Sequence, residues 1–339
     1  MTRATDPRAL VVRCAPGLAR VLQLEMRFRK LLPRGARPLV LHQRNHDLIF
    51  AKQAGAADAL QSLRVADDAG DCLAHGRFKV SAAQLDRIGA ACAGREPWRL
   101  LVSATGKHFN RMDTERFFAR ELRERRVRLL DDAARVLWVH LIDEKLYVVR
   151  QSFTRSRAHD RARIEERKGS LPATVAAAMV FVAELAKGER VLDPVCGSGT
   201  LLAEARAKEC DLGALLGFDV DAGAVRAARA NLRELAGADV RLGDGAATGL
   251  DAASIDAVLA NLPFGKQFGS VATNAALYTR LLAEARRLLR PRGRAVLLTS
   301  DTASLATALR AFDDAVVDEA FSVRIRGEAA KAYRLSFEL

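Results

Sequence analysis

The second half of the chain alternates between short apolar runs and longer segments in which apolar residues recur at helical spacing. The apolar runs have the length of buried strands and lie at 190–194, 213–219, 238–242, 255–260 and 294–299. The segments with helical spacing lie at 199–209, 221–236, 275–290 and 301–312. Strands and helices that alternate with short connections favour an α/β fold, in which parallel strands form a doubly wound, Rossmann-like sheet.

The last part of this half departs from the alternation. Residues 315–325 and 331–338 both have the pattern of strands, and a turn is expected between them at 326–329. Two strands joined by a turn predict an antiparallel hairpin, which closes the edge of the sheet. Pro291 and Gly293 should end the helix before the fifth strand.

The first half is less regular and predicts two smaller α+β units followed by a charged connector. Helices are expected at 17–32 and from Asp113 to about Arg128. The strands are expected at 9–14, 38–43, 46–51, 99–104, 135–141 and 145–150. The predicted boundaries are 1–70 and 71–155 for the two units, 156–170 for the connector and 171–339 for the second half.

The two halves differ sharply in charge. Residues 1–170 hold 34 Lys and Arg against 20 Asp and Glu, a net charge of +14, whereas residues 171–339 hold 20 against 21. Cations gathered on one part of a protein attract polyanions, so the first half is expected to bind nucleic acid. The alternative is a general drift of surface residues towards arginine, but that drift would enrich both halves.

Several classes of protein are excluded by what the sequence lacks. The five cysteines include no closely spaced pair, so neither a disulfide scaffold nor a cysteine zinc site is expected. The histidines show no metal-ligand spacing; His42 and His46 are four apart but are expected to be paired surface residues. No apolar run reaches the ~18 residues of a membrane span. We therefore expect a soluble, cytoplasmic protein without a metal, and a monomer is favoured although the sequence does not decide the oligomeric state.

The sharpest chemical feature is the segment VLDPVCGSGTLLAEA, from Val191 to Ala205. A strand ends at Asp193, and Gly197 and Gly199 then allow the backbone to turn close to a ligand before a helix begins. The amides at a helix start favour an anion. Taken alone, the two glycines could equally form only a tight turn between a strand and a helix.

Acidic residues follow the next two strands. Asp219 ends the second strand, where a carboxylate meets the ribose hydroxyls of a nucleotide in this type of sheet. Asp221 competes for that role but is better placed to cap the next helix. Asp244, in the turn after the third strand, could accept a hydrogen bond from an adenine amine, or it could simply form an Asx turn.

The fourth strand is followed by Asn261-Leu262-Pro263-Phe264-Gly265. The lone pair of an exocyclic base amine is delocalised into the ring, so the amine is a poor nucleophile. The Asn261 side-chain oxygen and the Leu262 carbonyl can accept its two hydrogens, and Phe264 can stack on the base. The alternative is an ordinary loop with a buried Phe. This explanation is the poorer one, because the other motifs follow the ends of the neighbouring strands.

Together these motifs resemble the class I S-adenosylmethionine-dependent methyltransferases, and among them the THUMP-domain RNA methyltransferases, which include tRNA guanosine-N2 methyltransferases. The resemblance is strongest over 168–312, through VLDPVCGSGT, GFDVD, LGDGA and NLPFGKQFGS. ALVVRCAPGLARVLQLE resembles the N-terminal ferredoxin-like unit of the family, and LLVSATGKHFNRMDTERFFARELRER resembles its THUMP module. The resemblance implies S-adenosylmethionine as cofactor and RNA as partner.

The resemblance also assigns roles to particular residues. The implied cofactor-binding residues are Ser170, Leu171, Pro172, Asp193, Cys196, Gly197, Gly199, Asp219, Val220, Asp244, Gly245 and Asn261. The implied catalytic residues, which would receive the target guanine, are Asn261, Leu262, Pro263 and Phe264.

Contacts to RNA are expected from the basic half and the connector. Lys107, His108 and Arg111 are expected in a loop without local partners, and Arg157 and Arg161 lie in the connector. Arginines on the helix that follows the loop are expected instead to form i,i+4 pairs, Arg120 with Glu124 and Glu121 with Arg125.

The chain departs from the family pattern in two places. Leu262 and Phe264 stand where many relatives have the second proline and the tyrosine of an NPPY loop, which leaves the choice of base open. The connector also lacks the basic-aromatic run that precedes the catalytic domain in the family. The expected reaction is methylation of the N2 amine of a guanosine, in the tRNA acceptor stem near nucleotide six. The alternatives are guanine N2 of ribosomal or small nuclear RNA, adenine N6, or a non-catalytic RNA-binding protein with a vestigial cofactor site.

Overall fold

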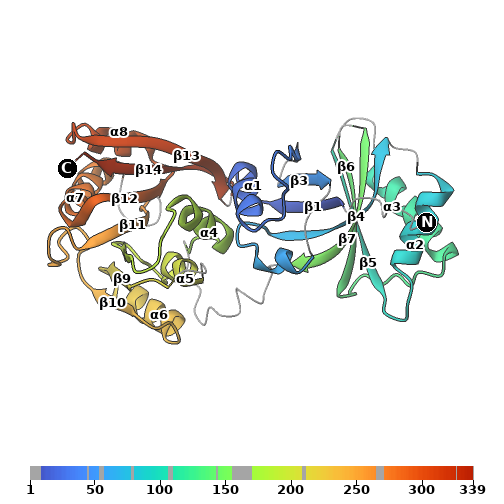
Figure 1. Ribbon diagram of the computed structural model, residues 1–339, viewed down its shortest axis with the longest axis horizontal. Coiled ribbons are helices and arrows are strands. Elements are labelled where there is room, and N and C mark those ends of the chain that lie inside the picture. Colours follow the sequence, from blue (N-terminus) through green and yellow to red (C-terminus); the bar gives the residue numbers. More distant parts are fainter. Residues whose placement is uncertain are drawn as a thin grey trace. The chain divides into compact units, whose positions relative to one another are not determined.

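The computed structural model divides the chain into two compact units, Met1–Ser156 and Arg157–Leu339 (Figure 1). It describes residues 9–43, 46–52, 57–77, 80–105, 110–142, 144–154, 170–207, 211–264, 271–325 and 327–338. The division falls at the start of the predicted connector, of which only residue 170 is described. Within the described residues, no helix is long and apolar enough to cross a membrane.

The first unit is built on one seven-stranded sheet with the order β2-β3-β1-β4-β7-β6-β5. Only β5 and β6 run parallel, and all other neighbours are antiparallel. The strands are β1 Ala9–Cys14, β2 Leu39–His42, β3 Asp47–Lys52, β4 Asp68–Arg77, β5 Trp98–Thr105, β6 Arg135–Ile142 and β7 Lys145–Thr154. The helices are α1 Ala19–Phe28, the short 3₁₀ helix η1 Ala57–Ser62, α2 Ala82–Ala91 and α3 Arg111–Glu124.

This sheet includes strands from both units predicted in the first half. The strands expected around 9–51 and 99–150 are confirmed, and β4 joins the two sets by pairing with β1 and β7. The sequence did not indicate β4, which carries two glycines and no β-branched residue. Gly70 is required there, because a Cβ atom would lie 2.2 Å from the carbonyl oxygen of Arg150 on β7. The predicted boundary at 70/71 lies inside β4, and it stays a prediction.

The second unit holds the predicted doubly wound sheet, with the order β10-β9-β8-β11-β12-β14-β13. The strands are β8 Arg190–Asp193, β9 Ala214–Asp219, β10 Ala238–Leu242, β11 Ile255–Asn261, β12 Leu289–Thr299, β13 Ala315–Ile325 and β14 Glu328–Phe337. The helices are α4 Ala173–Val182, α5 Thr200–Ala207, α6 Ala222–Leu232, α7 Val271–Leu288 and α8 Thr302–Leu309.

Five of these strands are parallel neighbours, and β14 pairs antiparallel with both β12 and β13. The α/β class and the terminal hairpin are therefore confirmed. Some predicted boundaries were wrong: β14 begins at Glu328 and not at 331, and β12 begins at Leu289 and not at 294. The chain stays extended through Pro291 because the pairing of β11 with β12 is shifted there, and Arg292 absorbs the irregularity with a φ of 67°.

Helices pack on the sheet in separate groups, α4 with α5 and α6, and α7 with α8 (Figure 1). Apolar side chains of β8, β9, β11 and β12 form one core with α7 and α8. Burial of this core fixes the parallel strands, so their carboxyl ends meet at one edge of the sheet, the usual place for a ligand in this architecture.

Candidate active site

The loop after β8 is shaped by its glycines. Gly197 has a φ of +53° and Gly199 a φ of +81°, in the left-handed region that favours glycine. The Gly197 amide donates to Asp219 Oδ2 over 2.9 Å, which ties the loop to the end of β9. A Cβ atom on Gly197 would meet nothing within 4 Å, whereas one on Gly199 would lie 2.9 Å from Leu232. Gly199 is thus packed against α6, and Gly197 faces open space where a ligand could lie.

A buried carboxyl group begins this loop. Asp193 is 2% exposed, and its Oδ1 accepts a hydrogen bond from the Val195 amide over 3.1 Å. Burial raises the pKa of Asp193 to about 8, and the nearby Asp219 carboxylate adds to the rise. A bound cation would favour the charged form, so the site suits an ammonium group.

The carboxylate of Asp219 lies between the loops after β8 and β9. Its Oδ1 accepts from the Asp221 amide over 2.9 Å, while its Oδ2 accepts from Gly197. Asp221 caps α6, as expected, by accepting from the Ala224 amide over 2.9 Å. The competition predicted between the two acids therefore favours Asp219 as the ligand-binding residue, although its role with a ribose stays a prediction.

Asp244 has two partners, of which only one was expected. Its Oδ1 accepts from the Ala246 amide over 2.9 Å, which is the predicted Asx turn, and its Oδ2 accepts from Arg280 over 2.5 Å. These two hydrogen bonds, the backbone one first, lower the pKa of Asp244. Arg280 lies on α7, 36 residues away, and nothing local in the sequence signals the pair. Gly245 brings the turn against the loop after β8, since a Cβ atom would lie 1.8 Å from the Pro194 carbonyl oxygen.

Two apolar side chains are exposed at this edge. Val220, one of the predicted residues, is 74% exposed, and Leu242 is 58% exposed. Leu242 is the register partner of Asp219, so both side chains flank that carboxylate. Exposed apolar residues next to a polar loop offer a surface to the ring of a nucleotide.

The residues before α4 contact the glycine loop. The hydroxyls of Ser170 and Ser198 lie 3.0 Å apart, Leu171 is buried, and Pro172 precedes the first turn of α4. Cys196 is buried and packs against Gly217, with burial raising the pKa of its thiol. Contact of these four residues with a cofactor stays a prediction.

The loop after β11 carries the predicted catalytic residues. Asn261 is the last residue of β11, and its side-chain Oδ1 is buried without a hydrogen-bond partner among the described residues. A buried acceptor left without a donor is costly, so native structures rarely keep one unless a ligand or water satisfies it. Phe264 is half-buried beyond it.

The backbone of this loop is held on two sides. The Leu262 amide donates to the Leu298 carbonyl over 2.9 Å, and the Leu262 side chain is buried in the core. The hydroxyl of Tyr278 donates to the Pro263 carbonyl over 2.6 Å and lies 3.0 Å from Thr299 Oγ1. Tyr278 and Thr299 were not predicted, because they come from α7 and β12 and no local motif marks them.

The candidate residues therefore share one edge of the sheet. β8 and β11 are parallel neighbours, so the loops that begin at Asp193 and Asn261 leave the sheet side by side. Within the described residues, the edge offers a buried acid, an open space beside Gly197, exposed apolar residues and an amide oxygen without a hydrogen-bond partner. This set fits S-adenosylmethionine, which combines an ammonium group, a ribose and an adenine ring with the methyl group to be transferred.

Most of the residues predicted to contact RNA fall outside the part of the chain that the structure describes. Lys107, His108, Arg157 and Arg161 lie outside the described residues. The expectation that Arg111 lies in a loop without a local partner was wrong, because Asn110 caps α3 and Arg111 is its first residue, 4.0 Å from Glu115. Its contact with RNA stays a prediction. The expected pairs of Arg120 with Glu124 and Glu121 with Arg125 are present, at 3.9 and 3.1 Å.

The expectation for the two histidines was only half right. His42 lies at the surface, and its Nδ1 is 2.8 Å from Asp47 Oδ1. His46 is instead half-buried, 6.0 Å from the ring of the buried His140. Burial, with Arg13 contributing, lowers the pKa of His46 to about 4. Within the described residues, no group of His, Cys, Asp and Glu is arranged to hold a metal ion.

The strand order, the antiparallel β14 and the loops at the carboxyl edge define the class I fold of S-adenosylmethionine-dependent methyltransferases. Residues 161–331 match the RMKL-like methyltransferase domain, and the chain belongs to that family.

Relatives and solved structures agree with this assignment. The chain is similar to the U6 snRNA (guanine-N(2))-methyltransferase THUMPD2 of Bos taurus, with 37% identity over 39% of the chain and 26% of that protein. It is also similar to the tRNA (guanine(6)-N(2))-methyltransferase THUMP3 of Mus musculus, with 31% identity over 41% of the chain and 30% of that protein. The chain thus spans less than a third of the length of either relative.

The crystal structure of TrmN from Thermus thermophilus resembles the whole chain. It superposes with a TM-score of 0.81 and 25% identity over 97% of this chain and 99% of that one. The resemblance therefore includes the first unit as well as the methyltransferase domain.

Proposed function

We propose that the protein transfers the methyl group of S-adenosylmethionine to the exocyclic N2 amine of a guanosine in RNA. The observation that carries this proposal is the buried Oδ1 of Asn261, which has no hydrogen-bond partner among the described residues and which an exocyclic amine would satisfy. Asn261 ends β11, beside the strand that leads into the glycine loop, so amine and cofactor would meet at one edge of the sheet. Both similar relatives named above are guanine-N(2) methyltransferases.

The cofactor would be held by residues of three loops. Asp193 would pair with its ammonium group, Gly197 would leave room for its chain, and Asp219 would bind the ribose hydroxyls. Val220 would pack on the adenine, and Asp244 with Gly245 would lie next to it. Bound in this way, S-adenosylmethionine supplies an electrophilic methyl group on a sulfonium.

The chain's own contribution to the transfer is positioning. Asn261 Oδ1 and the Leu262 carbonyl would accept the two amine hydrogens, which draws the nitrogen lone pair out of the base plane and stabilises the charge that develops on nitrogen. Phe264 would stack on the base. Bound S-adenosylmethionine would give up its methyl group to the nitrogen, with the electron pair of the C–S bond kept by sulfur, and the nitrogen would lose one proton to solvent. Alignment of the two reacting atoms at about 3–3.5 Å provides much of the rate.

The substrate we propose is tRNA, with the acceptor stem near nucleotide six as the site. The relative with 31% identity is named for tRNA guanine 6, and the net charge of +14 on residues 1–170 suits a polyanion. U6 small nuclear RNA is the second candidate, because the relative with 37% identity is named for it. We further propose a cytoplasmic protein, in which the thiols of Cys14, Cys72, Cys92 and Cys196 stay free.

Methyl transfer with the purified protein tests the proposal. The protein is incubated with S-adenosylmethionine and unmodified tRNA, small nuclear RNA or ribosomal RNA, and the nucleosides are then separated by mass spectrometry. We expect N2-methylguanosine in tRNA. Detection of N6-methyladenosine instead would show that the methylated base is adenine. Modification of another RNA would show that tRNA is not the substrate. Cofactor binding without transfer to any RNA would support the non-catalytic alternative.

Asn261→Ala is the variant that tests the site. Turnover should fall about 10²–10³-fold, because one preorganised acceptor in a dry site is lost, while the affinity for the cofactor changes little. Calorimetry measures the affinity, and single-turnover methylation measures the rate. Intact turnover with lost cofactor binding would contradict the role given to Asn261.

A further inference from the structure

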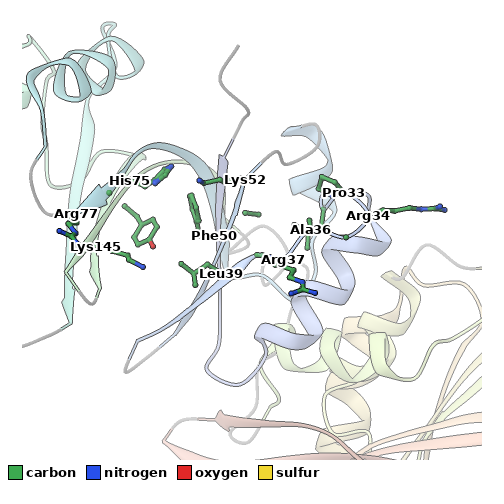
Figure 2. A pocket seen from close by; sticks show the side chains of 16 residues that line it. Pro33, Arg34, Ala36, Arg37, Leu39, Phe50, Lys52, His75, Arg77 and Lys145 are labelled. Carbon is green, nitrogen blue, oxygen red and sulfur yellow. The ribbon is translucent and has the colours of Figure 1, made fainter. Parts of the chain in front are cut away.

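A hollow of about 710 Å³ opens on the first unit. Its walls come from the segment 32–39 and from the ends of β3, β4 and β7 (Figure 2). The described residues of the lining include the cations Arg34, Arg37, Lys52, Arg77 and Lys145, and none of them is acidic. We propose that this hollow binds the phosphodiester backbone of an unpaired stretch of RNA.

The cations of the hollow have no side-chain partner in the part of the chain that the structure describes. All five are exposed, and none of them forms a side-chain ion pair or hydrogen bond with another described residue. By contrast, Arg116 and Arg120 on α3 in the same unit contact Asp113, Glu121 and Glu124. Among the described residues, the positive charge of the hollow therefore has no local compensation.

Two of these cations are placed directly opposite each other. Arg77 on β4 and Lys145 on β7 are register partners in the antiparallel ladder, just beyond the pair of His75 and Tyr147. Like charges at directly opposite positions destabilise a sheet. An anion that lies over both side chains would remove this repulsion, so the arrangement suits a bound phosphate.

The wall of the hollow formed by residues 32–39, and its floor, are held by contacts within the protein. The Pro33 carbonyl accepts from the Ala36 amide over 3.1 Å, Arg27 donates to the Ala36 carbonyl over 3.1 Å, and Gly35 supplies a φ of +76°. In the floor, the buried ring of Phe50 lies 5.3 Å from Tyr147. A preformed wall reduces the ordering cost of binding.

The shape and the chemistry both favour a single strand. A volume of this size matches pockets that enclose small ligands, whereas a duplex presents its phosphates on a convex surface and would touch only the rim. Phe50 and Tyr147 are buried, so they offer little to the edges of bases. The exposed ring of His75, 4.8 Å from Phe50, is the remaining surface for stacking. We therefore expect binding that depends on phosphate and salt and little on sequence.

The inference rests on the proposed RNA substrate, but it is tested separately by binding without cofactor. The variant combines Arg77→Gln with Lys145→Gln, and the matched control combines Arg116→Gln with Arg120→Gln, which removes the same charge from the same unit. Fluorescence anisotropy with the full chain measures the affinity for a labelled 12-nucleotide oligouridylate and for a 12-base-pair RNA duplex, at several salt concentrations.

We expect the hollow variant to bind the single strand about tenfold more weakly, with the salt slope reduced by about 1.4, and the control to change less than twofold. The duplex should lose less affinity than the single strand, and the melting temperature of the variant should not fall, because repulsion is removed. Unchanged affinity, an equal loss in the control, or a larger loss for the duplex would overturn the inference. Displacement of the oligonucleotide by uridine monophosphate at equal nucleotide concentration would also overturn the inference. The hollow would then bind a single nucleotide and not a stretch of RNA backbone.

The two hypotheses can fail independently. If the hollow variant loses RNA affinity but the wild type methylates no RNA, only the proposed function fails. If the wild type methylates RNA and the hollow variant binds and methylates normally, only the inference about the hollow fails.

Discussion

At the residue scale, the site depends on single atoms whose environment can be changed without altering the fold. Asp193 is the clearest case, because its carboxyl group is buried and its pKa is raised to about 8. The neutral form is therefore favoured in the free protein at pH 7. Binding of an ammonium group would favour the charged form.

Cofactor binding should consequently release a proton. At pH 7 the expected release is about 0.9 proton per cofactor, and calorimetry in buffers of different ionisation enthalpy measures it. Asp193→Asn should abolish the release and weaken binding about 10–100-fold. Because the folded pKa lies above the unfolded value, the free wild type should also lose stability as the pH rises towards and through about 8, and the variant should not. Equal proton release in both proteins would exclude Asp193.

Substitutions of Gly197 and Gly245 distinguish a glycine that leaves space for a ligand from a glycine that allows close backbone packing. Gly197→Ala should cost about 1–2 kcal/mol of stability through its positive φ, and it should weaken cofactor binding because the new methyl group enters the open space. Gly245→Ala should lower the melting temperature more, because its Cβ would meet the Pro194 carbonyl. Differential scanning calorimetry and cofactor titration distinguish the two effects. Normal cofactor affinity in Gly197→Ala would show that the open space is not the cofactor site.

At the element scale, α7 and β12 hold the loop that follows β11. Tyr278 is fully buried, and its hydroxyl reaches both the Pro263 carbonyl and Thr299. These two contacts join α7 and β12 to the loop after β11. Tyr278 therefore controls the position of Asn261 and Leu262 without belonging to their loop.

Removing the hydroxyl should loosen the loop and leave the cofactor site intact. We expect Tyr278→Phe to lower turnover about 10–100-fold, because a small displacement of positioning groups is costly, with cofactor affinity unchanged. Tyr333→Phe on β14 is the matched control and should keep normal turnover. A loss of cofactor affinity equal to the loss of turnover would indicate general destabilisation instead of a positioning role.

The elements that could be predicted are those whose pattern is local. Strands β8, β9, β10 and β11 have a local apolar pattern and lead into chemically marked loops, so the sequence predicted the strands and singled out Asp193, Asp219 and Asn261 at their ends. β4 was missed because its place in the sheet depends on close contact with β7, as Gly70 shows. Arg280, Tyr278 and the hollow were missed for the same reason: their partners come from distant parts of the chain.

At the scale of the whole molecule, charge and chemistry are divided between two units. Each has its own sheet and its own apolar core. The excess positive charge lies in the first half, and the proposed transfer site lies in the second.

Separate fragments should show this division directly. Residues 1–168 should bind tRNA with a steep dependence on salt, whereas residues 169–339 should bind it weakly and still bind S-adenosylmethionine. Filter binding at several salt concentrations measures the first property, and calorimetry measures the second. Equal tRNA affinity in both fragments would refute the argument from charge.

The order of strands in the second unit also bears on its synthesis. β13 is made before β14 but reaches the sheet only through β14, which lies between β12 and β13. While the ribosome has released β13 and not yet residues 328–337, that strand has no place to pair, and the flank of β12 that β14 will cover remains open. A nascent chain stalled in this window should therefore be a preferred client of chaperones that bind unpaired strands.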